Sequence, residues 1–314
     1  MKFDNRLILI LVAAVVIYAI FLFVSDYDTI SETISGFNVN FLPHILFFIT
    51  ASWIPIFIKW HFLLKNSNIH VPVKGNIVVF LSGMGLELTP GHVGALIKSQ
   101  ILKTKFSISR TKTAPIVLIE KVYDLIGAII ASIMGIIILG METYLIAIAL
   151  SALALIFFLM CYRPAFDLFL GLIAKRKFFS KYIENISDSY EIIKKSTSVK
   201  SFTICILLSI AYWSIISAGV YYILAGFGID MIDYLKILSI YTSSAFLGAI
   251  TFIPGGIGVT EGSLTGLLSM QGVDISVALV LSVMIRLFAF WYPVCVGFIS
   301  LNFSGVLSFR NNSF

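Results

Sequence analysis

The sequence predicts an all-α polytopic membrane protein, with six spanning helices and two re-entrant hairpins broken by Pro-Gly. Three observations lead to this prediction. Hydrophobic residues make up 59% of the 314 residues and charged residues only 12%, a balance that excludes an ordinary soluble domain. Apolar segments close to the length that crosses a bilayer recur along the chain. Two Pro-Gly-x-x-Gly segments interrupt the apolar sequence, at Pro90 to Gly94 and at Pro254 to Gly258.

The six spans are assigned by length and by their flanking residues. Residues 7–24 are too long for the apolar part of a signal peptide and lack its small-residue cleavage site, so we expect a span there. The segments 76–88 and 91–102 would each rise only about 20 Å as helices, too little for a hydrocarbon core of roughly 30 Å. Together they form the first predicted hairpin, and residues 234–270 form the second. The remaining spans are expected at residues 41–58, 113–139, 144–161, 202–225 and 275–301.

The distribution of basic residues predicts the topology. The loop 25–40 contains acidic residues and no Lys or Arg, whereas Lys59, Lys65 and Lys74 follow the second span. By the positive-inside rule, both termini should be cytoplasmic in a multi-pass protein of the cell membrane. This topology assigns every Lys and Arg to cytoplasmic loops or flanks except Lys121, Lys236 and Arg286.

We expect a single transmembrane domain over residues 1–314, with half-repeats at 41–161 and 202–301 in an inverted arrangement. The cytoplasmic segment 163–200 joins them. Apolar residues recur there at helical spacing among lysines, a pattern typical of an amphipathic helix on the inner leaflet. An ordinary solvated connector is the alternative.

The two tips suggest a site for an anion. In each predicted hairpin the second arm begins at the Pro-Gly tip, so two helix N-termini would point toward the membrane centre, where their free N–H groups favour negative charge. Transporters hold charged substrates between broken helices in this way. The tip residues expected to bind substrate are Pro90, Gly91, Gly94, Pro254, Gly255, Gly256 and Gly258.

Charged residues within apolar segments supply the second part of the predicted site. Insertion scales put the cost of one such residue at a helix centre at about 2.5 to 3.5 kcal/mol, so these residues must form pairs or line a wet cavity. Arg286 is expected to bind substrate. The residues expected to balance charge or to couple protons are Glu120, Lys121, Asp124 and Glu261. The alternative is an ion-pair network that only fastens helices together.

Other chemistry has little support. The net charge of +6 is explained by topology, and no nucleic-acid-binding signature accompanies it. Cys161, Cys205 and Cys295 and the four histidines lack metal-ligand spacing, and no phosphate-binding loop is present. We therefore expect no cofactor, no metal and no nucleic-acid partner.

Four motifs together resemble one known family. They are Leu88-Thr-Pro-Gly-x-x-Gly94 with Lys98 after it, Glu120-Lys-x-x-Asp124, Ile253-Pro-Gly-Gly-x-Gly-Val-x-Glu261 and Ile285-Arg-Leu-x-x-Phe-Trp-x-Pro293. Over nearly the whole chain the sequence resembles the transmembrane region of lysylphosphatidylglycerol synthase, also called the flippase-like family. The resemblance implies a lipid-translocating membrane protein and adds Lys98 to the expected substrate-binding residues. His92 and Ala95 stand where members commonly carry Arg and Glu.

The function predicted from the sequence is a lipid flippase or transporter that moves an anionic-headgroup lipid between leaflets, such as an aminoacyl-phospholipid or a polyprenyl-phosphate-linked glycan. Its partners would be membrane lipids, and the further partner considered is a glycosyltransferase or a lipid-modifying enzyme. A membrane-embedded lipid-modifying enzyme with the carboxylates as general base is one alternative. A non-transporting accessory to a membrane glycosyltransferase is another.

Overall fold

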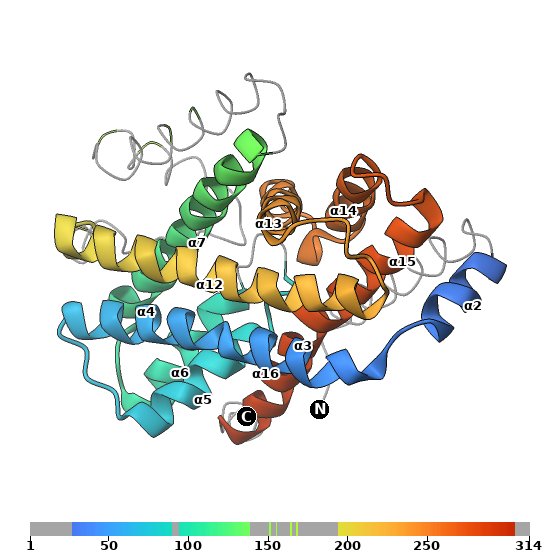
Figure 1. Cartoon of the computed structure of the whole chain (residues 1–314). Helices are drawn as coiled ribbons and strands as arrows, with labels where there is room; N and C mark the ends of the chain where they lie inside the picture. Colours follow the sequence, from blue (N-terminus) through green and yellow to red (C-terminus); the bar gives the residue numbers. More distant parts are fainter. Residues whose placement is uncertain are drawn as a thin grey trace.

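The computed structural model describes residues 27–89, 94–138 and 194–304, together with the single positions 151, 155, 164 and 168. The described secondary structure is helical, without a strand (Figure 1). Three helices in this part of the chain are long and apolar enough to cross a membrane: Val39–Asn66, Val199–Gly226 and Ile275–Phe303. The all-α membrane fold is confirmed. The expected spans 7–24 and 144–161 and the segment 163–200 lie wholly or largely outside the described residues, so the count of six spans remains a prediction.

The first of these long helices is built from η1 (Val39–Phe41), α3 (Leu42–Ala51) and α4 (Trp53–Asn66). Pro43 and Pro55 each lie in the first turn of a helix, where the missing N–H has no carbonyl partner to lose. The helix continues past the expected end at residue 58. Lys59 is therefore a helical residue with no exposed surface, and its assignment to a cytoplasmic flank stays a prediction.

Two short helices follow at the first predicted hairpin. They are α5 (Val73–Met84) and α6 (Ile97–Phe106), and the tip residues 90–93 between them lie outside the described part. The long helix α7 (Arg110–Ile138) comes next and has 29 residues. The shortness of α5 and α6 agrees with the sequence, but how deep the pair enters a bilayer remains a prediction.

The second half contains α12 (Val199–Gly226), α13 (Tyr234–Ile250), η4 (Pro254–Gly256) and α14 (Val259–Ser269). The last long helix consists of α15 (Ile275–Arg286), the π-helical segment η5 (Leu287–Trp291) and α16 (Tyr292–Phe303). Pro293 cannot donate a backbone hydrogen bond, and it lies two residues after the end of the π-helical segment. Because π-helical turns are local distortions that often mark functional sites, the position of η5 immediately after Arg286 draws attention to that residue.

The helices pack in a crossed arrangement. Helix α12 lies along α3 and α4 and also contacts α7, while α13 packs between α7 and α14 (Figure 1). Helix α16, near the C-terminus, packs against α5. There Gly297 approaches the backbone of Gly85 so closely that an added Cβ would lie 2.0 Å from the Gly85 nitrogen. Such close contacts between small residues are typical of helix packing inside membranes, where packing rather than water exclusion holds helices together.

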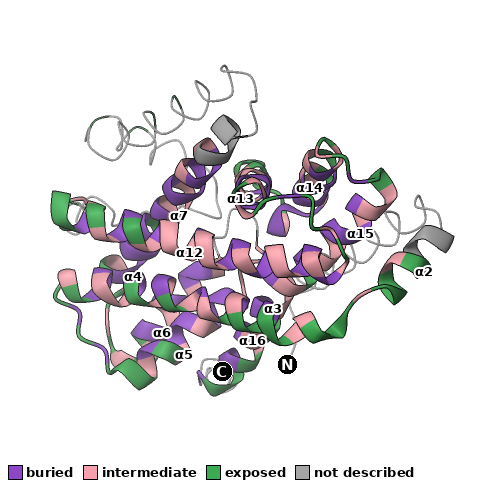
Figure 2. Cartoon of the chain, viewed as in Figure 1, coloured by how far each residue is buried: buried purple, intermediate pink, exposed green. Residues whose placement is uncertain are grey.

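The buried residues form an interior that runs between these helices, and exposed residues cover the outside (Figure 2). Large apolar side chains are common among the exposed residues, including Phe47, Ile54, Leu207 and Ile299. A soluble protein rarely exposes so many, whereas a lipid-facing surface requires them. Helix α2 (Tyr27–Ser35) lies within the predicted loop 25–40. It is amphipathic and contacts α15.

Candidate functional site

The second Pro-Gly segment forms a tight turn between α13 and α14. Gly255, Gly256 and Gly258 all have positive φ. At Gly256, with φ of +64°, an added Cβ would also lie 2.6 Å from Thr260 Oγ1, so both conformation and space require glycine. Gly258 is the N-cap of α14. The helix break therefore lies where the sequence placed it.

Glu261 occupies the N-terminus of α14. Its carboxylate is buried, and Oε2 accepts the N–H of Gly258 at 2.7 Å. A carboxylate is favoured here because it satisfies an unpaired N–H group and lies at the positive end of the helix dipole. The N–H of Gly258 is thus already bonded to the chain's own carboxylate, and anion binding at the rest of this N-terminus stays a prediction.

Arg286, the last residue of α15, fixes the same turn from the opposite side. Its Nε donates to Glu261 Oε1 at 2.8 Å, and its Nη2 donates to the carbonyl of Gly255 at 2.5 Å. The guanidinium carbon lies 3.9 Å from the centre of the Phe290 ring. These two hydrogen bonds use two of the five guanidinium donors. Arg286 is therefore paired with Glu261 and not with Glu120, and it holds the tip and the last long helix together.

A corresponding ion pair follows the first Pro-Gly segment, but here the first helix carries the cation and the next helix carries the carboxylate. Lys98 on α6 donates to Glu120 on α7 at 2.5 Å, and both side chains are almost fully buried. The Lys98 ammonium lies 4.3 Å from the centre of the Trp60 ring. In each half, the arm after the Pro-Gly segment thus carries one charge, and the next helix carries its partner. Pro90, Gly91 and His92 lie outside the described residues, while the N–H of Gly94 donates to Thr89 Oγ1 at 2.5 Å.

Four further charges form a chain across α4, α7 and the turn after α5. Lys59 forms an ion pair with Asp124 and also donates to Ser209 Oγ at 2.8 Å. Lys121 lies 4.0 Å from Asp124 and 2.5 Å from Glu87. Charges therefore alternate along Lys59, Asp124, Lys121 and Glu87. Although Glu120 and Asp124 share one helix, the structure gives them separate partners.

Sequence reasoning missed two members of this chain. Glu87 stands in apolar sequence just before the first Pro-Gly segment, as Glu261 stands just after the second, so the same signal could have found it. Lys59 comes at the end of an apolar run, where its sequence context is that of an ordinary cytoplasmic flank. Only the packing of α4 against α7 shows that Lys59 is an interior residue.

The pairing explains how the chain tolerates so many charges in apolar surroundings. A buried ion left without a partner is strongly destabilising, whereas a well-made pair offsets most of the desolvation cost. The fastening role that the sequence left as an alternative is thus supported for Arg286 with Glu261 and for Lys98 with Glu120. Each pair connects two consecutive helices, α6 with α7 and α14 with α15.

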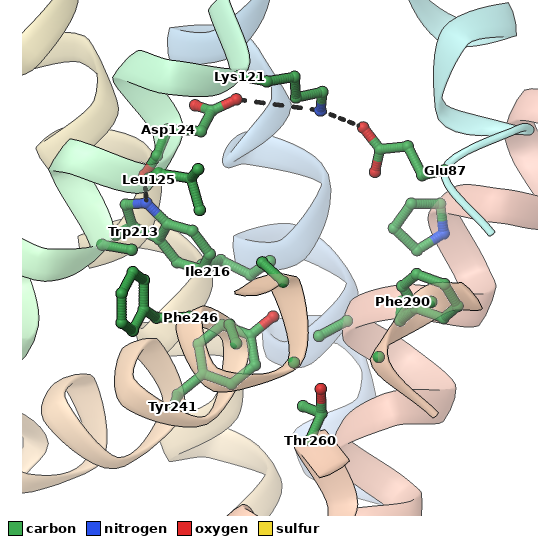
Figure 3. A pocket seen from close by; sticks show the side chains of 18 of the residues that line it. Glu87, Lys121, Asp124, Leu125, Trp213, Ile216, Tyr241, Phe246, Thr260 and Phe290 are labelled. Atoms are coloured by element: carbon green, nitrogen blue, oxygen red, sulfur yellow. Dashed lines mark hydrogen bonds and ion pairs between the residues drawn. The ribbon is translucent and has the colours of Figure 1, made fainter. Parts of the chain in front are cut away.

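A cavity of about 310 Å³ lies between the charge chain and the second tip. Figure 3 shows Glu87, Lys121 and Asp124 along one side, with Tyr241, Thr260 and Phe290 on another. Gly255, Gly256 and Arg286 also line it, and aromatic and aliphatic side chains make up most of the remaining wall. Ligand pockets are typically of at least this size, with an apolar lining and a few polar groups. Glu120, Lys98 and Glu261 do not line the cavity.

Comparison with known proteins places this architecture in a family. A family model described as the lysylphosphatidylglycerol synthase TM region matches residues 10–297. The chain belongs to this family. The match includes both Pro-Gly segments, all eight ion-paired residues described above and every described residue that lines the cavity. The resemblance seen in the sequence motifs is confirmed.

The curated relatives are archaeal membrane proteins. The chain is 25% identical over 284 residues to the UPF0104 membrane protein PH1989 of Pyrococcus horikoshii, covering 81% of this chain and 82% of the relative. It is 26% identical over 215 residues to the UPF0104 membrane protein MJ1078 of Methanocaldococcus jannaschii, covering 67% of this chain and 90% of that protein. These names describe membrane proteins and state no substrate.

Proposed function

We propose that this family member moves a lipid with an anionic headgroup between the two leaflets without altering it covalently. The observation that carries the proposal is the cavity bounded by Lys121, Arg286 and the second Pro-Gly tip. It brings two cationic side chains into a largely apolar chamber inside a membrane protein. A phosphate near these cations and acyl or prenyl chains against the apolar wall would match its two kinds of surface.

The broken helix supports the same function. Discontinuous helices that meet within the membrane are a common way for transporters to hold a charged substrate, and the turn at Gly255 and Gly256 lines the cavity directly. The family name refers to lysylphosphatidylglycerol, a lipid with a phosphate in its headgroup. An aminoacyl-phospholipid or a polyprenyl-phosphate-linked glycan would be a lipid of the required chemistry.

Within this proposal the ion pairs have two roles. Glu261 and Glu120 keep Arg286 and Lys98 compensated, which allows a charged interior to remain folded when no lipid is bound. Asp124 and Glu87 lie beside the cavity, where charge balance can change when a lipid enters or leaves. Protonation of a carboxylate during lipid passage would couple transport to protons.

Reconstitution into liposomes tests the function. The pure protein should make an inner-leaflet phosphatidylglycerol or polyprenyl-phosphate lipid accessible from outside, with the lipid's mass unchanged. Ala245 lines the cavity, so Ala245→Phe should fill part of it and reduce the rate toward that of protein-free liposomes. Gly262→Phe is the matched control because Gly262 is exposed and has open space around its Cβ position. Failure to accelerate any lipid, together with a new lipid product when a donor is added, would replace the transport proposal with the enzyme alternative.

A further inference from the structure

The cavity is electrically balanced when it is empty. Its charged lining residues are Glu87, Asp124, Lys121 and Arg286, two carboxylates and two cations. An entering phosphate diester would add a negative charge to surroundings of low polarity, where an uncompensated ion is costly. A lipid with an anionic headgroup therefore fits only if one of the existing carboxylates leaves its cation or is neutralised.

The ion pairs differ in how easily they can exchange partners. In the pair of Lys121 with Glu87, each side chain is 27% exposed. Arg286 and Glu261 are 8% and 1% exposed, and Glu261 is also bound to the N–H of Gly258. Both members of the first pair line the cavity, whereas in the second pair Arg286 lines it and Glu261 does not.

Asp124 is a poorer candidate for exchange than Glu87. It lies against Lys59, which has no exposed side-chain surface, so its departure would leave a buried ammonium without its carboxylate. Glu87 belongs to the turn that follows α5, where its N–H donates to the carbonyl of Met84 at 3.1 Å. A turn residue can move away with less disruption than a residue held within a long helix.

From these contacts we propose that Glu87 is the carboxylate that a phosphate-bearing lipid headgroup displaces from Lys121. The inference rests on the proposed function and deepens it by naming the specificity-determining pair. In the empty protein Glu87 neutralises Lys121 and excludes other anions. When the headgroup takes its place, Glu87 is released, and it lies only three residues before Pro90 at the first Pro-Gly segment.

A binding measurement tests the displacement separately from transport. The purified full chain in neutral detergent is titrated with dihexanoyl phosphatidylglycerol, and binding is followed by isothermal calorimetry. Glu87→Gln removes the competing charge and should tighten binding about tenfold, which corresponds to ~1.4 kcal/mol. Lys121→Gln should weaken it by a similar factor, and adding Glu87→Gln to Lys121→Gln should bring no further gain. The matched control Glu32→Gln, at an exposed position on α2, should bind as the natural protein does.

Two further ligands define the chemistry that is recognised. Dihexanoyl phosphatidylcholine, whose headgroup has no net charge, should show no gain in Glu87→Gln. Inorganic phosphate should gain, because the carboxylate that excludes other anions from Lys121 has lost its charge. The proposal would be overturned by an equal gain with phosphatidylcholine in Glu87→Gln. It would also be overturned if phosphatidylglycerol binding was unchanged or weaker, including the case in which inorganic phosphate alone gained. A gain that persists in the Lys121→Gln background would also overturn it.

If Glu87→Gln does not elute as a folded protein in gel filtration, Glu87→Asp replaces it. The shorter Asp side chain reaches Lys121 less well, so the Glu87→Asp protein should still bind phosphatidylglycerol more tightly than the natural protein does. An equal or lower affinity refutes displacement. Binding that depends on Glu87 as described, without acceleration of lipid movement in liposomes, supports displacement and refutes transport. Lipid movement in liposomes, combined with binding that does not change in Glu87→Gln, supports transport and refutes displacement.

Discussion

Replacement of Glu261 by Gln tests the ion pair that holds the second tip. Gln keeps the size of the side chain and can still accept the Gly258 N–H, so the main loss is the negative charge facing Arg286. Breaking a buried pair by removing one partner costs about 3 to 5 kcal/mol. Both side chains are almost fully buried, so solvent screening lowers this free-energy cost only slightly. Arg286 still contacts the Gly255 carbonyl and the Phe290 ring in this variant. We therefore expect a loss of stability at the lower end of that range, about 3 kcal/mol.

The double variant Glu261→Gln with Arg286→Gln separates charge from shape. Because neither partner is then charged, its loss of stability should be smaller than the sum of the two single losses by about 2 kcal/mol. The assay is equilibrium unfolding in mixed micelles at increasing sodium dodecyl sulfate, followed by tryptophan fluorescence. Asp230→Asn, an exposed carboxylate in the loop before α13, is the control and should change stability by less than about 0.5 kcal/mol.

Additive losses, or a Glu261→Gln protein as stable as the control, would refute the reasoning that this pair fastens the tip. The lipid transport of the double variant gives a second result. If Arg286 also attracts the headgroup, transport should stay low although stability has recovered. Recovered transport would show that Arg286 acts only as a fastener.

Two other predictions concern packing and topology. Gly297→Ala should destabilise the protein by about 1 to 3 kcal/mol in the same unfolding assay, because its Cβ would meet the backbone of Gly85, whereas Gly266→Ala on α14 has open space and should be neutral or slightly stabilising. A Gly297→Ala protein of undiminished stability would contradict the close crossing of α5 and α16. For the topology, single cysteines in a cysteine-free background should react with an impermeant thiol reagent from outside near Asp28, Glu142 and Asp230, but not near Lys74, Lys105 and Lys177. External labelling near Lys105 would reverse the assignment of the first hairpin.

Much of this architecture follows from the sequence because the constraints involved are local. Composition and segment length predict an all-α membrane protein, since a bilayer requires apolar helices that satisfy their own backbone hydrogen bonds. Gly255, Gly256 and Gly258 predict the break between α13 and α14, since a run of positive φ values is accessible chiefly to glycine. The sequence likewise identified Glu120, Asp124, Glu261 and Arg286 as interior charges, because a charge in a long apolar segment stands out from its neighbours.

The tertiary structure alone decided which charges meet. Pairing depends on how α4, α6 and α7 cross and on where the turn after α5 lies, and neither is encoded in the spacing of residues along one helix. Lys59 shows the limit most clearly: its sequence context is that of a membrane flank, yet the packing of α4 on α7 buries it against Asp124. Glu261 likewise bonds the N–H of Gly258, and only the fold shows that its second carboxylate oxygen pairs with Arg286. An ion pair is a long-range contact, so its partner is fixed by the assembled fold, whereas the need for a partner is fixed by the residue and its apolar surroundings.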